Sequence, residues 1–224
     1  LLLMSRVMAL TSASDDSYHV PMLIDNNTQV PSRIKAIIEK TGEDPGPVLI
    51  AMARRLVQAG VEALAMPCNT AHHYAPLLKE SISIPFLDMV ELTADRIQCL
   101  RSSADHAAVF RVGMLASPAV RITGVFDPAF SARGLKPVYP PDQDGMLTCI
   151  RMIKAGGENS AAIELLQNAA IELIAMGVDA LLVACSELSI IKNSLLQKTL
   201  VIDTIDVLAE AVISFSRDGL DPRM

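Results

Sequence analysis

The chain has 224 residues, of which 51% are hydrophobic and 4% aromatic, and its formal net charge at pH 7 is −6. This length allows one large domain or two small ones, each with a buried core, and the acidic balance argues against a nucleic-acid surface, which needs a basic face. No apolar run approaches the roughly 20 residues that span a bilayer. The four cysteines form neither a disulfide framework nor a zinc-binding spacing. We therefore expect a cytoplasmic protein without metal, membrane or nucleic-acid partners.

The first ten residues have the pattern of a helix interior. In a parallel α/β sheet a strand and a turn would come before such a helix, so we expect the first strand of the fold to be missing from this sequence. Arg6 interrupts the apolar run, and no small-residue cleavage site follows it. The sequence therefore argues against a signal peptide.

Apolar runs of strand length then alternate with amphipathic stretches of helix length, which is typical of a parallel α/β sheet with crossover helices. A proline at its start and Gly60 just past its end predict a helix over Pro47–Ala59. Gly177 in the same way closes a second predicted helix, Asn159–Met176. A last helix, Ile205–Ser216, is expected to pack back on the first half. The predicted strands are Val20–Ile24, Val61–Met66, Ile84–Asp88, Val109–Ala116, Lys136–Tyr139, Val178–Ala184 and Leu200–Asp203.

One unit of sequence occurs twice. Residues 60–68 read Gly-Val-Glu-Ala-Leu-Ala-Met-Pro-Cys, and residues 177–185 read Gly-Val-Asp-Ala-Leu-Leu-Val-Ala-Cys. The likeness continues downstream, where Ile-Pro-Phe-Leu-Asp at 84–88 corresponds to Leu-Val-Ile-Asp at 200–203. A strand-ending cysteine unit used twice can place two thiols in mirror-related positions on either side of a cleft. Inversion of a carbon centre requires two such opposed proton carriers.

The polar stretch Arg101–His106 is the best candidate for a domain boundary, because it follows an amphipathic helix and precedes a new buried strand. We predict a first α/β domain of residues 1–100 together with 205–224, and a second of residues 101–204. Both would have mainly parallel sheets.

Cys68 and Cys185 are each predicted to lie at the carboxyl end of a strand, just before a helix. Ligands bind at that edge of open α/β sheets. The partial positive charge of a helix N-terminus is expected to lower the thiol pKa from about 8.5 and to attract a carboxylate. Alternatively, both could be buried cysteines that pack as small apolar groups, but their shared register favours a site. Cys99 and Cys149 lie within predicted helices and are expected to take no part.

Met-Pro-Cys-Asn-Thr-Ala-His at 66–72 and Ala-Cys-Ser-Glu-Leu at 184–188 resemble the aspartate/glutamate racemase superfamily, and most closely its aspartate racemases. Segments 25–27, 30–33 and 42–45 resemble it as well. The resemblance implies two similar domains related by a pseudo-twofold axis, an active site in the cleft between them, no pyridoxal phosphate or other cofactor, and a homodimer. It assigns the acid and base to Cys68 and Cys185. Ala184 and Ser186 stand where the family usually has glycine and threonine.

Several polar residues are candidates for contact with an acidic amino acid. The resemblance places a carboxylate-binding arginine at Arg33 and a cleft-facing lysine at Lys154, although a solvated arginine and a helix-ending lysine explain them equally well. Asn26 and Asn27 are either turn formers or donors to substrate. The predicted substrate-binding residues are Asn26, Asn27, Arg33, Asn69, Thr70, Lys154 and Ser186, with His72 and Glu187 expected behind the cysteines.

The sequence thus predicts a racemase that interconverts L- and D-aspartate. One cysteine, as thiolate, would remove the α-proton while the other, as thiol, supplies a proton to the opposite face. Glu187 stands where glutamate racemases carry histidine, which favours aspartate as substrate. Glutamate or broad-specificity racemisation, a maleate-type isomerase, and a non-catalytic protein that binds acidic metabolites stay open as alternatives.

Overall fold

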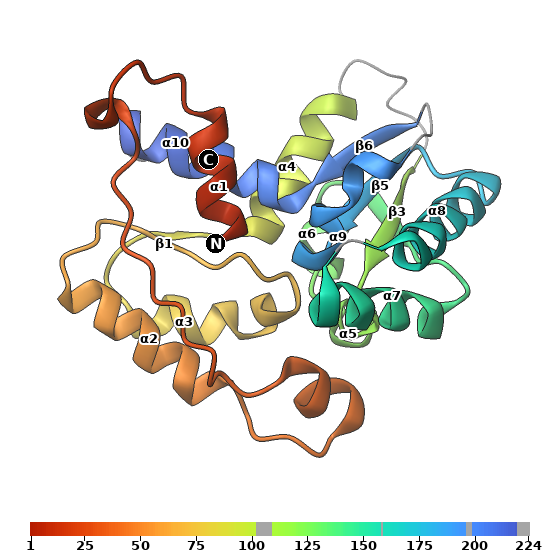
Figure 1. Cartoon of the computed structure of the whole chain (residues 1–224), viewed down its shortest axis with the longest axis horizontal. Coiled ribbons are helices and arrows are strands. Elements are labelled where there is room, and N and C mark those ends of the chain that lie inside the picture. Colours follow the sequence, from red (N-terminus) through yellow and green to blue (C-terminus); the bar gives the residue numbers. More distant parts are fainter. Residues whose placement is uncertain (102–108, 158, 196–198, 219–224) are drawn as a thin grey trace.

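The computed structural model describes residues 1–101, 109–157, 159–195 and 199–218. The chain is a mixed α/β protein with two parallel sheets (Figure 1). One sheet pairs β1 (Leu64–Ala65) with β2 (Phe86–Leu87), and the other has the order β4-β3-β5-β6. Its strands are β3 (Phe110–Ala116), β4 (Leu135–Val138), β5 (Ala180–Ala184) and β6 (Leu200–Asp203).

Helices cover both faces of the four-stranded sheet, as parallel sheets require. Buried residues of α7 (Gln143–Gly156), α8 (Ser160–Ala175) and α9 (Ser186–Ile190) pack on one face. Residues of α4 (Met89–Arg101), α5 (Pro118–Thr123) and α6 (Asp127–Ala132) pack on the other. Strand β5 and residues 112–116 of β3 are buried, so these segments read in the sequence as continuous apolar runs rather than as alternating ones.

The two-stranded sheet is covered in the same way. On one side, α2 (Gly46–Gln58) and α3 (Ala75–Ser81) share an apolar cluster with β1 and β2. On the other side, α1 (Leu2–Leu10), α4 and α10 (Thr204–Asp218) bury a second cluster. As the sequence predicts, the last helix returns to the first half, and Figure 1 shows α10 running from β6 to α1.

Short helical turns connect several of these elements. A π-helical turn, η2 (Ile34–Glu39), lies near α5, and a 3-10 turn, η3 (Thr70–Tyr74), follows β1. Two further 3-10 turns, η1 (Asp16–Tyr18) and η4 (Lys192–Ser194), lie after α1 and α9. Within the described ranges, every helix is too short or too polar to cross a membrane.

The glycines at the start of the repeated unit have the same conformation in both copies. Gly60 and Gly177 have φ angles of 87° and 76°, and each follows the last turn of a helix. This left-handed conformation favours glycine because it has no Cβ. The repeated sequence therefore encodes the same transition twice: a helix ends before glycine, and the strand that follows is succeeded within three residues by a cysteine.

Most predicted elements are confirmed, but the strand at Val20–Ile24 is wrong. These residues form an extended loop in which Leu23 and Ile24 are exposed. Pro21 lacks a backbone donor, and an apolar run becomes a strand only when a neighbouring strand is there to pair with it. The strands predicted at Val61–Met66 and Ile84–Asp88 exist but pair over only two residues each.

The predicted boundary at Arg101–His106 falls mostly on residues 102–108, outside the described residues, so the domain division stays a prediction.

Close packing of β3 against its neighbours gives a stability test. A Cβ added to Gly113 would lie 3.0 Å from Leu181 and 3.1 Å from Val178, both side-chain atoms. Gly113→Val is therefore expected to lower the free energy of unfolding by about 1–3 kcal/mol through overpacking, as measured by urea denaturation. Gly156→Ala is the control, because no atom lies within 4 Å of its added Cβ. Equal losses in the two variants would contradict this account of the core.

Candidate functional site

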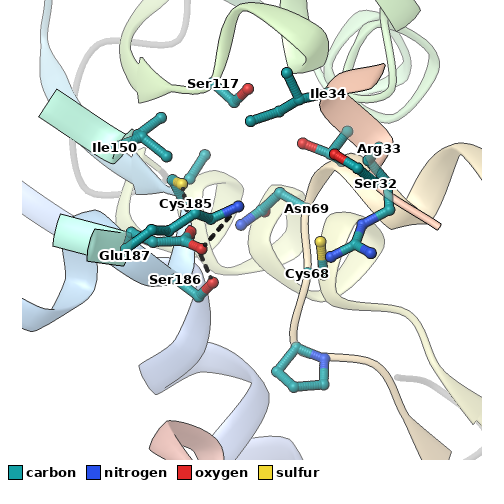
Figure 2. A pocket seen from close by; sticks show the side chains of 14 residues that line it. Ser32, Arg33, Ile34, Cys68, Asn69, Ser117, Ile150, Cys185, Ser186 and Glu187 are labelled. Carbon is teal, nitrogen blue, oxygen red and sulfur yellow. Dashed lines mark hydrogen bonds and ion pairs between the residues drawn. The ribbon is translucent and has the colours of Figure 1, made fainter. Parts of the chain in front are cut away.

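A cavity of about 180 Å³ opens where the carboxyl ends of both sheets face one another. Its volume is below that of sites for drug-sized ligands, so it suits a small metabolite. Figure 2 shows the two cysteines on different sides of it. The lining residues are Ser32, Arg33, Ile34, Pro67, Cys68, Asn69, Thr70, Ser117, Ile150, Lys154, Ala184, Cys185, Ser186 and Glu187.

The two copies of the repeated unit deliver the two thiols. Cys68 follows β1 and precedes η3, whereas Cys185 directly follows β5 and precedes α9. Cys68 is half-buried and Cys185 is 8% exposed, yet both line the cavity. Cys99 on α4 is exposed and Cys149 in α7 is buried, and neither lines it. The structure thus brings together the two cysteines that the sequence singled out and leaves the other two outside.

The environment of Cys185 favours the protonated thiol. Burial raises the pKa of Cys185 well above its usual range, and the nearby Glu187 carboxylate raises it further. Cys185 Sγ donates a hydrogen bond to Glu187 Oε2 at 3.0 Å, which stabilises the thiol. The expectation that a helix N-terminus lowers this pKa is therefore wrong for Cys185. Helix α9 has only five residues, so its dipole is too small to offset burial beside a carboxylate.

Glu187 is held as a carboxylate despite its own burial. Burial alone would raise its pKa, but hydrogen bonds from Cys185 and Ser186 and the charge of Lys154 lower the pKa instead. Ser186 Oγ donates to Oε2 at 3.1 Å, and Lys154 Nζ lies 3.3 Å from Oε1. Figure 2 shows these contacts as dashed lines on the Cys185 side of the cavity. Lys154 therefore adds positive charge to the cavity and fixes Glu187.

Arg33 supplies a cation on the Cys68 side. It directly precedes η2, and its Nη1 donates to the Pro31 carbonyl at 3.1 Å. Among the described residues, no carboxylate forms an ion pair with Arg33. Its planar guanidinium, drawn beside Cys68 in Figure 2, keeps donors available for a bidentate contact with a bound carboxylate.

His72 supports the Cys68 loop from behind. It is 3% exposed; its Nδ1 lies 2.8 Å from the Cys68 carbonyl oxygen, and its Nε2 accepts from the Met89 amide at 3.1 Å. An Nε2 that accepts carries no proton, so Nδ1 must be the donor. Burial lowers the pKa of His72, which keeps the ring neutral. The contact goes to the backbone of Cys68, so His72 positions the loop rather than touching the thiol.

Asn69 and Thr70 line the cavity next to Cys68. Asn69 is 2% exposed, and its Nδ2 donates to Thr204 Oγ1 at 3.0 Å. Its Oδ1 has no hydrogen-bond partner in the described part of the chain. A buried acceptor without a partner is costly unless a ligand satisfies it. Asn69 thus lines the cavity, and the atom that has no partner among the described residues is its enclosed amide oxygen.

Asn26 and Asn27 do not line the cavity. Asn26 is exposed, and Asn27 Oδ1 accepts a hydrogen bond from the Gln29 amide at 2.9 Å. This contact is the local turn that asparagine side chains commonly form. The geometry agrees with turn formation at Asn27, and contact of either residue with substrate stays a prediction.

Six lining residues are not among the predicted site residues: Ser32, Ile34, Pro67, Ser117, Ile150 and Ala184, of which Pro67 and Ala184 belong to the two cysteine motifs. Ser117 directly follows β3, so the rule that ligands bind at carboxyl ends of strands could have found it. Ile150 lies one helical turn before Lys154 on α7, so helical spacing could have found it. Ser32 and Ile34 flank Arg33, but no motif or spacing in the sequence identifies them as residues that line a site. The described residues contain no group of three or more His, Cys, Asp or Glu side chains suited to a metal ion.

Comparison with known proteins places this geometry in context. The family model of Asp/Glu/hydantoin racemases matches residues 2–212. The broad-specificity amino-acid racemase RacX of Bacillus subtilis (strain 168) is 25% identical over 167 residues, which cover 74% of this chain and 70% of that protein. The structure of Picrophilus torridus aspartate racemase superposes with a TM-score of 0.78 at 27% identity, over 96% of this chain and 87% of that one.

A more distant structure shares the fold alone. Glutamate racemase from Francisella tularensis, in complex with D-glutamate, superposes with a TM-score of 0.63 at 18% identity. The match covers 96% of this chain and 75% of that one.

The hydrogen bond between Cys185 and Glu187 generates a prediction about thiol acidity. Glu187→Gln removes the negative charge that opposes ionisation, so the pKa of Cys185 should fall. The alkylation rate of Cys185 by iodoacetamide, followed peptide by peptide in mass spectrometry, should then rise at lower pH than in the wild type. Cys149 serves as an internal reference, because burial raises its pKa to about 11 without any carboxylate. An unchanged profile at Cys185 would show that Glu187 does not control the thiol.

Proposed function

This chain belongs to the Asp/Glu/hydantoin racemase family, and from that premise we propose that it interconverts L- and D-aspartate without a cofactor, by proton transfer between two cysteines. The observation that carries the proposal is that Cys68 and Cys185, the ends of the duplicated unit, line one cavity from two different sheets. The homodimer expected from the resemblance stays a prediction.

The proposed reaction uses the two thiols in different protonation states. Cys68, as thiolate, takes the α-proton and becomes a thiol. Cys185, already a thiol, gives its proton to the opposite face of the carbanion and becomes a thiolate. The cation of Lys154, next to Glu187, offsets the negative charge that then develops beside Cys185. The opposite direction uses the same groups with their roles exchanged.

The charges of the cavity support an acidic amino acid as substrate. Arg33 and Lys154 provide two cations for two carboxylates. The hydroxyls of Thr70 and Ser117 can donate to the oxygens on which charge develops after the α-proton leaves. These groups are held in place before substrate binds, which is how an enzyme stabilises a carbanion without a cofactor.

A second candidate is racemisation of a wider range of amino acids. Ile34 and Ile150 also line the cavity, and their apolar side chains can accommodate an uncharged substrate side chain. The similarity to a broad-specificity amino-acid racemase agrees with this alternative. The identity of the substrate side chain is therefore the question to test first.

A chiral assay on single-enantiomer amino acids, without added cofactor, tests the proposal. We expect aspartate to be racemised fastest, with glutamate and neutral amino acids at least about tenfold slower. Comparable rates on several neutral amino acids would favour the broad-specificity alternative. Absence of any product, combined with binding of aspartate, would replace the proposal with a non-catalytic binding protein. Conversion of maleate alone would point to an isomerase of diacids.

Removal of either cavity thiol should abolish turnover. Cys68→Ala and Cys185→Ala are each expected to lower kcat by at least about 1,000-fold, because general acid–base groups contribute roughly 10²- to 10⁴-fold and each direction needs both. Cys149→Ala is the matched control, since it removes a buried thiol away from the cavity. Circular dichroism confirms the fold of each variant. Near-normal turnover in either of the first two variants would exclude the two-cysteine mechanism.

Arg33 should be sensitive even to a change that keeps its charge. Lysine cannot reproduce the planar fork of a guanidinium, so Arg33→Lys is expected to lower kcat/KM for aspartate by about 10- to 100-fold. The control is Arg54→Lys, an exposed arginine on α2. Steady-state kinetics that match the wild type would assign Arg33 to the solvated surface.

A further inference from the structure

We propose that Ser189 is a positioning residue for Cys185, the counterpart of His72 at Cys68. The inference rests on the proposed function for the reaction in which Cys185 takes part. Ser189 does not line the cavity and is fully buried, so it acts through the first turn of α9, which begins directly after Cys185.

The residue four positions after each cavity cysteine contacts the carbonyl oxygen of that cysteine. In the first copy of the repeated unit, His72 Nδ1 donates to the Cys68 carbonyl oxygen at 2.8 Å. In the second copy, the Ser189 amide donates to the Cys185 carbonyl oxygen at 3.1 Å, and Ser189 Oγ lies 3.2 Å from the same atom. The likeness between the two copies therefore extends from the strands to the support of each cysteine.

Behind each support lies an aspartate at the end of the next strand. Asp88 and Asp203, which correspond in the repeat, each accept a hydrogen bond at 2.9 Å on Oδ1 from the amide two residues further on. Each also forms an ion pair through Oδ2, Asp88 with Lys79 at 2.7 Å and Asp203 with Lys192 at 3.1 Å. Both aspartates are thus fixed at each of their oxygens and can anchor a neighbouring side chain.

The two copies differ in how the support is joined to its aspartate. His72 Nε2 lies 3.9 Å from Asp88 Oδ1, beyond hydrogen-bond range. Ser189 Oγ, by contrast, lies 2.8 Å from Asp203 Oδ1. The serine hydroxyl has one hydrogen, and it goes to the carboxylate, which is nearer than the Cys185 carbonyl and gives the stronger bond. Ser189 is therefore attached to β6 by its hydroxyl, while its amide holds Cys185.

This attachment fixes the turn that presents the acid of the proposed reaction. Cys185 and Glu187 lie at the start of α9, where the thiol donates to the carboxylate at 3.0 Å. Without the Ser189 hydroxyl, the turn keeps its backbone hydrogen bonds but loses its attachment to β6. Proton transfer is sensitive to small displacements of the reacting groups. Loss of the hydroxyl should therefore impair Cys185 and leave Cys68, which His72 supports, unaffected.

Primary deuterium isotope effects can distinguish the two cysteines. The equilibrium constant of racemisation is one, so any variant lowers kcat/KM equally in both directions; for Ser189→Ala we expect about tenfold. Proton transfer at Cys185 then becomes the slow step. With α-deuterated enantiomers of the best substrate, the isotope effect on kcat/KM should rise for the enantiomer that Cys185 deprotonates and fall for the one that Cys68 deprotonates.

His72→Gln should shift the isotope effects in the opposite sense. Glutamine loses the donor to the Cys68 carbonyl, so proton transfer at Cys68 becomes the slow step. A general loss of packing would instead change both enantiomers alike. The inference is overturned if Ser189→Ala alters both isotope effects equally, alters neither, or raises the same one as His72→Gln.

Thr11→Val is the matched control. Thr11 is buried at the end of α1, and its Oγ1 donates to the Val7 carbonyl oxygen, four residues earlier, at 2.6 Å. Like Ser189→Ala, this change removes one buried hydroxyl, but it does so away from the residues that line the cavity. It should leave kcat/KM and both isotope effects unaltered. Shifts as large as those in Ser189→Ala would assign the effect to packing and would also overturn the inference.

Alkylation without substrate keeps this inference distinct from the proposed function. A buried thiol reacts through local opening, which costs one hydrogen bond less in Ser189→Ala. Iodoacetamide should therefore modify Cys185 about 3- to 10-fold faster than in the wild type, with the rate at Cys68 unchanged. Equal acceleration at both cysteines, or none at Cys185, would refute the positioning role. If the wild type racemises no amino acid, the proposed function fails, and the alkylation rates still decide the part played by Ser189.

Discussion

Helix α10 leaves the four-stranded sheet at the end of β6 and buries its apolar side against α1 and α4, next to the two-stranded sheet. Ile205, Leu208 and Ala209 on this helix are fully buried. Each large side chain contributes roughly 1.5–3 kcal/mol by leaving water, so this packing holds the two sheets in a fixed relation. The cavity depends on that relation, because one sheet carries Cys68 and the other carries Cys185.

Polar groups buried beneath the cavity refine this arrangement. His72 ties the carbonyl of Cys68 to the first turn of α4, and Thr204 ties Asn69 to β5. Hydrogen bonds between buried groups are directional and costly to break. They therefore fix the orientation of the loops, whereas the apolar clusters fix only their approximate position.

The electrostatics of the two cysteines are unequal, although the sequence units that carry them are alike. Burial raises the pKa of Cys185, and the neighbouring Glu187 carboxylate raises it further, so the thiol stays protonated. Figure 2 shows that Arg33 lies on the Cys68 side of the cavity, where its positive charge favours a bound anion. The proposed two-cysteine reaction needs one base and one acid at the start of each turnover, and this difference agrees with Cys185 as the initial acid. The electrostatic difference between the two cysteines comes from their neighbours, Glu187 and Arg33, rather than from the repeated segments.

The sequence by itself determined the pattern of alternating strands and helices, the glycines that end α2 and α8, and the two cysteines at strand ends, because these follow from local periodicity and backbone conformation. Only the tertiary structure decided that Val20–Ile24 is a loop, since a strand needs a partner that the local sequence does not reveal. The direction of the Cys185 pKa shift and the contact of Thr204 with Asn69 were likewise decided by tertiary structure. Burial, charge and hydrogen bonding at the cavity depend on which distant segments meet there, and that depends on how α10 packs.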